Sequence, residues 1–167
     1  MQDKIFNVLF LCTGNSARSV MAEALLNVLG KGRFKAYSAG SHPSGQVQPI
    51  ARELAEAIGY DARQLRSKDW DEFSVEGAPE MDIVITVCDN AAGESCPLWL
   101  GHPALAHWGV PDPVAATGDE ADRRRAYTAA FALLRRRVEL LLSLPLASLD
   151  HLAAQAKLRE IGRVGAE

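Results

Sequence analysis

The sequence has little cysteine, few aromatic residues and no excess of basic charge. Its 167 residues include 3 cysteines, 7% aromatic residues and a formal net charge of -3. A small, odd number of cysteines argues against a structural disulfide framework. The slightly acidic balance offers no basic surface to nucleic acid. We therefore expect neither a disulfide-stabilised domain nor a nucleic-acid-binding protein.

The sequence also lacks a long apolar run. The apolar stretch at residues 5–11 is too short to span a membrane, and no targeting signal is evident. We therefore expect no membrane partner and, by default, a cytoplasmic location. Apolar residues make up 48% of the chain and charged residues 23%, which is ordinary for a soluble globular protein. The length suits one domain with a proper core.

Apolar runs and helical periodicity alternate along the chain, which indicates an α/β fold with a mostly parallel sheet. Functional residues of such sheets lie at the carboxyl ends of the strands. Cys12, Cys88 and Asp112 each follow an expected strand, so they should meet at one edge. The patterns predict strands at 5–11, 34–38, 82–87 and 105–108, helices at 17–29, 49–58, 119–142 and 148–161, and a helical turn at 69–73.

The segment from Cys12 to Ser19, here called the oxyanion loop, joins the first expected strand to the first helix. Backbone N–H groups of such a turn, together with the helix N-terminus, bind a phosphate-like anion. Gly14 permits a tight bend, Asn15 tolerates a left-handed conformation, and Arg18 offers a planar fork of donors. The expected anion-binding residues are Thr13, Gly14, Asn15, Ser16, Ala17, Arg18 and Ser19.

Cys12 begins this loop, so the positive charge of the helix N-terminus and of Arg18 acts on its sulfur. A thiol at a helix N-terminus beside an arginine has its pKa lowered to roughly 3.5–7.5, and the hydroxyls of Ser16 and Ser19 are further donors. We therefore expect a Cys12 thiolate that attacks the central atom of the anion. Asp112, between two prolines, is the candidate general acid, although aspartate in that setting is also a common turn residue.

These residues resemble the low-molecular-weight protein tyrosine phosphatases and, more closely, the arsenate reductases built on the same fold. The resemblance covers roughly residues 5–142 and implies a three-layer α/β sandwich, with a four-stranded parallel sheet in the order 2-1-3-4 flanked by helices. We accordingly expect a phosphatase-like arsenate reductase domain at 1–143 and a C-terminal helical extension at 144–167. The other matching motifs are Glu23, Tyr37-Ser38-Ala39-Gly40, Cys88, Cys96-Pro97, His107-Trp108-Gly109 and Asp112-Pro113.

The resemblance to arsenate reductases implies a thiol relay that detoxifies arsenic. Cys12 would bind arsenate, Cys88 would attack the Cys12 sulfur to release arsenite, and Cys96 would take over the disulfide. Thioredoxin, or glutaredoxin with glutathione, would restore the thiols, and phosphate or sulfate would compete for the loop. Seven residues separate Cys88 from Cys96 where the thioredoxin-coupled pattern has six, which leaves the reductant open. Ala17 stands where related loops often carry a cysteine that the relay does not require.

Three other interpretations stay open. The first is a phosphatase that hydrolyses phosphotyrosine or a small phosphoester, although Val114 and Ala115 stand where such phosphatases usually have paired tyrosines. The second is a binding module that only senses phosphate or redox state, for which a general acid such as Asp112 has no use. The third concerns Cys88 and Cys96 alone, which would be a buried thiol and a surface thiol without a redox role.

The resemblance also implies a monovalent cation, potassium or sodium, behind the oxyanion loop. The matching positions are Asn15, Glu23, Ser38 and Asp69, with Ser67 nearby, and their oxygen atoms suit a hard cation. Glu23 serves equally well as a buried acceptor that braces the loop. No tightly bound cofactor is expected.

Two features are less specific. The arginine runs at 123–125 and 135–137 indicate a solvated helix face rather than a docking site. Residues 144–167 contain an expected helix that begins with Ser148 as its cap. Part of an apolar stripe on it is given by Leu149, Leu152, Ala153, Ala156, Leu158 and Ile161. This extension either packs on the parent domain or mediates dimerisation.

Overall fold

A parallel β-sheet forms the centre of the molecule in the computed structural model, which describes residues 4–88 and 102–164. The strands follow the order β2-β1-β3-β4, and every neighbouring pair is parallel. The α/β fold and this strand order confirm the expectation from the sequence. The strands are β1 (Phe6–Cys12), β2 (Phe34–Gly40), β3 (Ile83–Thr86) and β4 (Ala104–His107).

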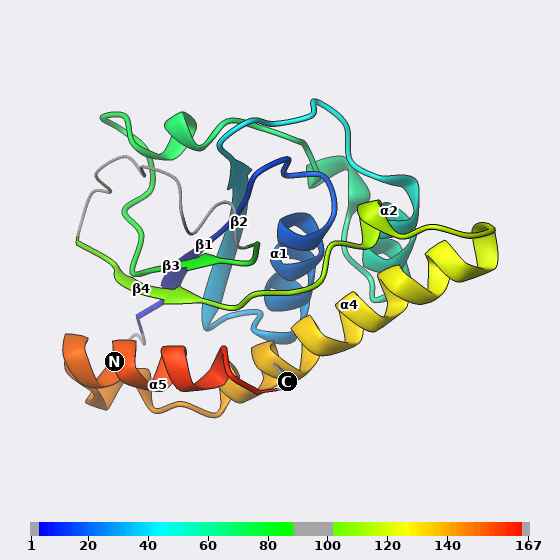
Figure 1. Cartoon of the computed structure of the whole chain (residues 1–167). Coiled ribbons are helices and arrows are strands. Elements are labelled where there is room, and N and C mark those ends of the chain that lie inside the picture. The colour runs from blue at the N-terminus through cyan, green and yellow to red at the C-terminus, as the bar shows by residue number, and fades with distance from the viewer. Residues whose placement is uncertain (1–3, 89–101, 165–167) are drawn as a thin grey trace.

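Helices α1, α2 and α4 lie together on one side of the sheet (Figure 1), and α1 packs on β1 and β2 while α4 packs on α1. The α-helices are α1 (Arg18–Leu29), α2 (Pro49–Ala57), α4 (Glu120–Leu142) and α5 (His151–Ile161). Four short 3-10 helices complete the described elements: η1 (Ala62–Gln64), η2 (Trp70–Phe73), η3 (Pro113–Ala115) and η4 (Leu146–Ser148).

Strand β1 contributes side chains to two separate hydrophobic clusters. Val8 and Phe10 belong to the large cluster that includes α1 and α4, whereas Leu9 and Leu11 belong to a smaller cluster with η2. Successive side chains of a strand point to opposite faces. The continuous apolar run of β1 is therefore what a strand covered on both faces requires, and it fixes the oxyanion loop at the end of a rigid element.

The C-terminal helix α5 packs on its own chain, along the edge strand β4. The Trp108 indole Nε1–H donates to the backbone oxygen of Leu158 at 2.9 Å, and the N–H of Leu105 donates to Gln155 Oε1 at 2.9 Å. Leu158 is fully buried in the large cluster. Of the two alternatives for this segment, the structure therefore shows the one in which it packs on the parent domain.

The start of α5 differs from the sequence-based expectation. Ser148 lies in η4 rather than at the helix cap, and the Asp150 carboxylate instead accepts a hydrogen bond from the backbone N–H of Ala153 at 2.8 Å. Both residue types cap helices well. The turn that follows Pro145 moves the start of the helix past Ser148, which sequence pattern alone does not reveal.

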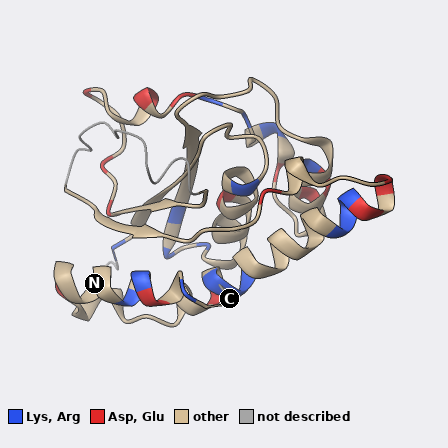
Figure 2. Ribbon diagram, viewed as in Figure 1, with Lys and Arg blue, Asp and Glu red and all other residues tan. Residues whose placement is uncertain are grey.

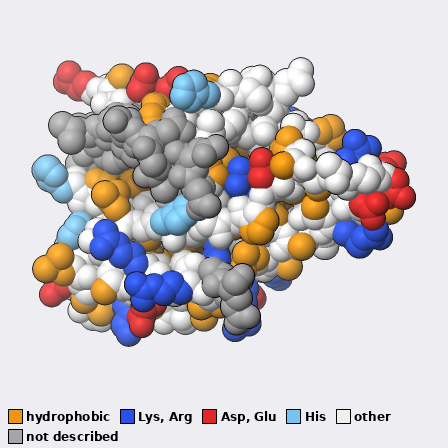
Figure 3. All heavy atoms as spheres, in the orientation of Figure 1, with side chains coloured by type: hydrophobic (Ala, Val, Ile, Leu, Met, Phe, Trp, Pro, Cys, Tyr) orange, Lys and Arg blue, Asp and Glu red, His pale blue; other side chains and the backbone are white. Residues whose placement is uncertain are grey.

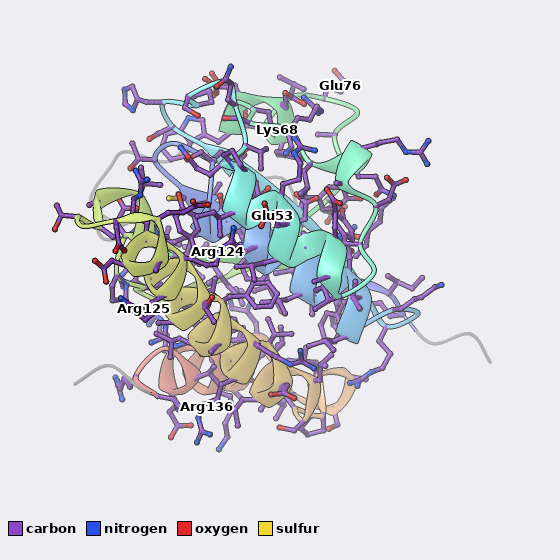
Figure 4. The ribbon with its side chains drawn as sticks, turned by 90° about the vertical axis from the view of Figure 1, so that its right-hand side faces the viewer. Glu53, Lys68, Glu76, Arg124, Arg125 and Arg136 are labelled. Atoms are coloured by element: carbon purple, nitrogen blue, oxygen red, sulfur yellow. The ribbon has the colours of Figure 1, made fainter. Side chains whose placement is uncertain are left out.

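Arg137 contradicts the expectation that both arginine runs form a solvated helix face. Its side chain is fully buried, and its guanidinium donates to the backbone oxygens of Gly109 and Val164, each at 3.0 Å. The neighbouring Arg136 points away from α4 (Figure 4). In the other run, Arg124 forms an ion pair with Glu53 of α2 at 2.8 Å. Arg137 thus ties α4 to the loop after β4 and to the C-terminal segment.

Charged residues of both signs are distributed over the ribbon (Figure 2), and on the face drawn in Figure 3 they lie among hydrophobic side chains. This mixture agrees with the formal net charge of -3. Within the described ranges, none of the helices is both long and apolar enough to cross a bilayer.

Candidate active site

The carboxyl ends of three strands meet at one edge of the sheet, as expected from the sequence. Cys12 ends β1, Cys88 follows β3 and Asp112 follows β4. The backbone N–H of Thr13 donates to the Cys88 sulfur at 3.2 Å, and a guanidinium nitrogen of Arg18 lies 3.6 Å from Asp112 Oδ2. The third cysteine, Cys96, lies outside the residues that the structure describes.

The backbone of the oxyanion loop is turned so that its carbonyl groups point outward. Backbone N–H groups from segment 42–48 donate to the oxygens of Thr13, Gly14 and Ser16 at 2.9, 3.0 and 2.8 Å. The N–H of each following residue belongs to the same planar peptide and points the opposite way, into the loop. These inward N–H groups line a concavity of the kind that binds anions, in the segment where the sequence predicts an anion site.

The first turn of α1 adds to this concavity because no side chain caps it. Ala17 stands at the N-cap position without a capping hydrogen bond, and the first turn contains no acidic residue. The free N–H groups and the positive end of the helix dipole are therefore available to an anion. An aspartate or serine at position 17 would occupy those donors itself.

Asn15 adopts the left-handed conformation expected from the sequence, with φ 47°. Its side-chain amide nitrogen donates to Ser19 Oγ at 2.8 Å, and its Oδ1 accepts the backbone N–H of Lys68 at 2.8 Å. Ser19 is fully buried, and because its hydroxyl accepts in this contact, its own proton is left to donate. These hydrogen bonds hold Asn15 in a backbone conformation that non-glycine residues rarely adopt. Such strain persists only where the surrounding contacts fix it.

The glycine that the loop needs is Gly40 rather than Gly14. Gly14 lies outside the left-handed region, and an added Cβ would meet only Ser16 Oγ at 3.6 Å. A Cβ on Gly40 would lie 2.4 Å from the backbone oxygen of Thr13 and 2.9 Å from that of Cys12. Gly40 pairs with Cys12 across β2 and β1, so the sheet and the loop approach each other too closely for any side chain.

Arg18 connects the oxyanion loop to Asp112. One guanidinium nitrogen donates to the backbone oxygen of Val110 at 2.9 Å, while the other faces Asp112 Oδ2. The second carboxylate oxygen, Oδ1, accepts the N–H of Val114 at 2.9 Å and so caps η3. Asp112 therefore performs the turn role and also presents one oxygen to the site. Its side chain is 41% exposed, against 13% for Arg18, so protons can reach it from solvent.

The side chains of Cys12 and Cys88 are in hydrogen-bond contact, and this contact corrects the expectation of a lowered Cys12 pKa. Both side chains are buried, and neither is part of a disulfide. A hydrogen bond with Cys88 and then burial raise the pKa of the Cys12 thiol, while Arg18 and the Gly14 N–H lower it. Because the two thiols interact, the loss of a proton from one is coupled to that from the other. Sequence patterns do not place the two sulfurs this close together.

The four residues predicted to hold a monovalent cation each make hydrogen bonds within the protein. Ser38 donates to Glu23 Oε1 at 2.6 Å, and Asp69 Oδ1 accepts the N–H of Asp71 at 2.8 Å. Asn15 Oδ1 is bound to Lys68 as described above. The sequence-based reasoning missed Lys68, whose ammonium lies 3.9 Å from Glu23 Oε1. Its position beside Asp69 in the sequence was the available signal.

The comparisons with known proteins agree with this geometry. The model of the low molecular weight phosphotyrosine protein phosphatase family matches residues 7–156. Arsenate reductase of Bacillus subtilis (strain 168) is 37% identical over 123 residues, which cover 74% of this chain and 84% of that protein. A structure described as an arsenate reductase in the phosphate binding state superposes with TM-score 0.66 at 27% identity, covering 83% of this chain and 97% of the other. An arsenate reductase from Archaeoglobus fulgidus superposes with TM-score 0.58 at 30% identity, covering 79% and 98%.

Proposed function

The chain belongs to the low molecular weight phosphotyrosine protein phosphatase family, and within it we propose that this protein reduces arsenate to arsenite through a thiol relay. The observation that carries the proposal is the position of the Cys88 sulfur, which accepts a hydrogen bond from Thr13 inside the oxyanion loop. Hydrolysis of a phosphoester needs a water molecule there rather than a second thiol. Relatives named arsenate reductase support the same choice.

The first step joins Cys12 to arsenate. The Cys12 sulfur attacks arsenic while the loop N–H groups and Arg18 bind the oxygens. Asp112 protonates the departing oxygen, which leaves as water. Arg18 and the Gly14 N–H lower the Cys12 pKa and so favour the thiolate that this step needs.

The second step transfers two electrons. The Cys88 sulfur attacks the Cys12 sulfur, so an S–S bond forms and the S–As bond breaks. The electron pair of that bond stays on arsenic, which leaves as arsenite. Oxidation of two thiols to the Cys12–Cys88 disulfide balances the reduction of As(V) to As(III).

The third step restores Cys12. Cys96 attacks the Cys88 sulfur, which releases the Cys12 thiol and moves the disulfide to Cys88–Cys96. A dithiol protein such as thioredoxin, or glutathione with glutaredoxin, then reduces that disulfide and is itself oxidised. This step depends on the sequence resemblance, since Cys96 lies outside the described residues.

The order of the relay can be tested by counting arsenite and mapping disulfides. In an assay coupled to thioredoxin, thioredoxin reductase and NADPH, the wild type should turn over with arsenate, whereas Cys12→Ser, Cys88→Ser and Cys96→Ser should not. Cys96→Ser should release one equivalent of arsenite and accumulate a Cys12–Cys88 disulfide, because nothing resolves it. Cys88→Ser should release none.

Full turnover in Cys88→Ser or Cys96→Ser would refute the relay. Brisk hydrolysis of phosphoesters without any arsenate-dependent oxidation of NADPH would instead favour the phosphatase. A protein that binds phosphate but performs neither reaction would be the sensing module. Weak hydrolysis beside arsenate reduction is expected, because one loop serves both attacks.

A further inference from the structure

A buried ion pair lies directly behind the oxyanion loop. Lys68 Nζ is 3.9 Å from Glu23 Oε1 and donates to the backbone oxygen of Arg66 at 2.8 Å. The side chains of Lys68 and Glu23 are only 7% and 6% exposed. Figure 4 shows Lys68 in the layer of loops above α2. A charged pair so completely removed from water is costly unless further hydrogen bonds satisfy it.

Those further hydrogen bonds are present around the carboxylate. Ser38 donates to Glu23 Oε1 at 2.6 Å and Tyr60 donates to Oε2 at 2.7 Å. Burial raises the pKa of Glu23, and Lys68, Ser38 and Tyr60 counter it. Burial likewise lowers the pKa of Lys68, and Glu23 counters it. Each partner thus favours the charged form of the other, against burial, which leaves the pKa of Glu23 raised and that of Lys68 lowered.

The backbone of Lys68 holds the loop itself. Its N–H donates to Asn15 Oδ1 at 2.8 Å, and its carbonyl oxygen accepts the N–H of Gly40 at 2.9 Å. Asn15 is the left-handed residue of the loop, and Gly40 is the residue against which the loop packs. One residue therefore connects the buried carboxylate to the two positions that set the shape of the loop.

Lys68 places an ammonium group beside Glu23, the buried carboxylate at this place. A hard cation in a protein is held by several oxygen ligands, carboxylates among them. Here Asn15 Oδ1 accepts the Lys68 N–H, Asp69 Oδ1 accepts the Asp71 N–H, and Glu23 faces an ammonium group. The positive charge that a cation would bring is already supplied by the chain.

We propose that Lys68 is a positioning residue whose ammonium group acts as a built-in counter-cation to Glu23, so that the oxyanion loop keeps its shape without bound potassium or sodium. The proposal concerns the same site as the proposed arsenate reduction. Its main test measures the folded protein without arsenate, so the two can fail separately. A cleft of about 750 Å³ lined by Glu23, Tyr60, Arg66 and Lys68 gives ions from solvent a path to the pair.

The test compares thermal unfolding in potassium chloride and in tetramethylammonium chloride at equal ionic strength, since the larger cation cannot enter. The wild type should have the same Tm in both salts. Lys68→Ser leaves Glu23 without its partner and should lower Tm by roughly 5–10 °C in tetramethylammonium chloride. Potassium should restore at least half of that loss with a saturable dependence on concentration.

Two further variants test whether the effect depends on the charge of the side chain and on its position at residue 68. Lys68→Met fills the same volume without a charge, so it should be destabilised and potassium should not rescue it. Lys31→Ser removes an exposed lysine from the same cleft and should leave Tm unchanged in both salts. Phosphate protection of Cys12 from alkylation should follow the same pattern, weakening in Lys68→Ser and recovering with potassium.

Several outcomes would overturn the proposal. One is a saturable rise in the Tm of the wild type with potassium, which would mean that the protein binds the ion despite Lys68. Another is a folded Lys68→Ser protein that binds phosphate normally in tetramethylammonium chloride. If Lys68→Ser does not fold in either salt, the comparison of the wild type in the two salts still decides the matter.

Discussion

The Cys88 sulfur accepts a hydrogen bond from the backbone N–H of Thr13, so the second cysteine reaches into the loop that begins with the first. Thr13 Oγ1 lies 3.5 Å from the same sulfur. A thiol held there influences Cys12 before any anion is bound, because its hydrogen bond with Cys12 raises the pKa of the Cys12 thiol. The first prediction concerns this influence.

Replacing Cys88 by alanine should make Cys12 more acidic. The contact with Cys88 is the largest cause that raises the Cys12 pKa, and alanine removes it while Arg18 continues to favour the thiolate. The pH profile of Cys12 alkylation by iodoacetamide should therefore move to lower pH, with a rate at pH 7 about tenfold higher. Cys96→Ser is the parent and control, and Cys88→Ala/Cys96→Ser is the variant. An unchanged profile would mean that burial alone sets the pKa of Cys12.

Asp112→Asn should slow the first chemical step without weakening anion binding. The amide keeps the acceptor for the Val114 N–H but cannot deliver a proton. Arsenate turnover should fall by about 10²- to 10⁴-fold, while the affinity for phosphate stays the same or rises because a negative charge beside Arg18 is lost. Asp71→Asn, at an exposed acidic residue, is the control. Equal activity in the two variants would assign Asp112 only its turn role.

Gly40→Ala should damage the oxyanion loop more than Gly14→Ala does. The new methyl group at position 40 would meet backbone oxygens of Thr13 and Cys12, which cannot move aside as a side chain can. We expect a loss of about 1–3 kcal/mol in the free energy of unfolding and weaker phosphate binding. Gly14→Ala should leave stability within about 1 kcal/mol. Urea titrations and calorimetric phosphate titrations measure both effects, and the reverse ranking would contradict the geometry.

Arg137→Met should destabilise the fold by about 2–3 kcal/mol, because the partly buried backbone oxygens of Gly109 and Val164 lose their donors. Arg136→Met is the matched control. It removes the same charge from the adjacent, exposed position and should change stability by less than about 0.5 kcal/mol. Chemical unfolding of both proteins at one pH checks the pair. Similar losses in the two would mean that helix charge, rather than the buried contacts, stabilises this region.

The architecture could be predicted from the sequence because the signals that specify it are local. The β1 run from Phe6 to Leu11 is apolar at every position except Asn7, which indicates a strand covered on both faces. Asn15 and Arg18, placed between an expected strand and an expected helix, indicated an anion-binding loop, and the left-handed conformation of Asn15 is confirmed. Because strand ends gather at one edge of a parallel sheet, the meeting of Cys12, Cys88 and Asp112 also followed.

What could not be predicted depends on contacts between distant residues. Lys68 and Arg137 are charged, and a charged residue in a polar segment or an arginine run is normally exposed. Each is buried because groups far away in the sequence satisfy it: Glu23 for Lys68, and Gly109 with Val164 for Arg137. The raised pKa of Cys12 has the same origin, since it depends on how near Cys88 comes.

The packing of α5 on β4 has a consequence for the molecule in a crowded solution. An edge strand presents unpaired backbone groups on which a strand from another chain can grow. On β4, the outward N–H of Leu105 is bound by Gln155 and its carbonyl oxygen accepts Arg159 Nε at 3.2 Å. The terminal helix thus closes one open side of the sheet with side-chain hydrogen bonds, which protects the protein against aggregation through that edge.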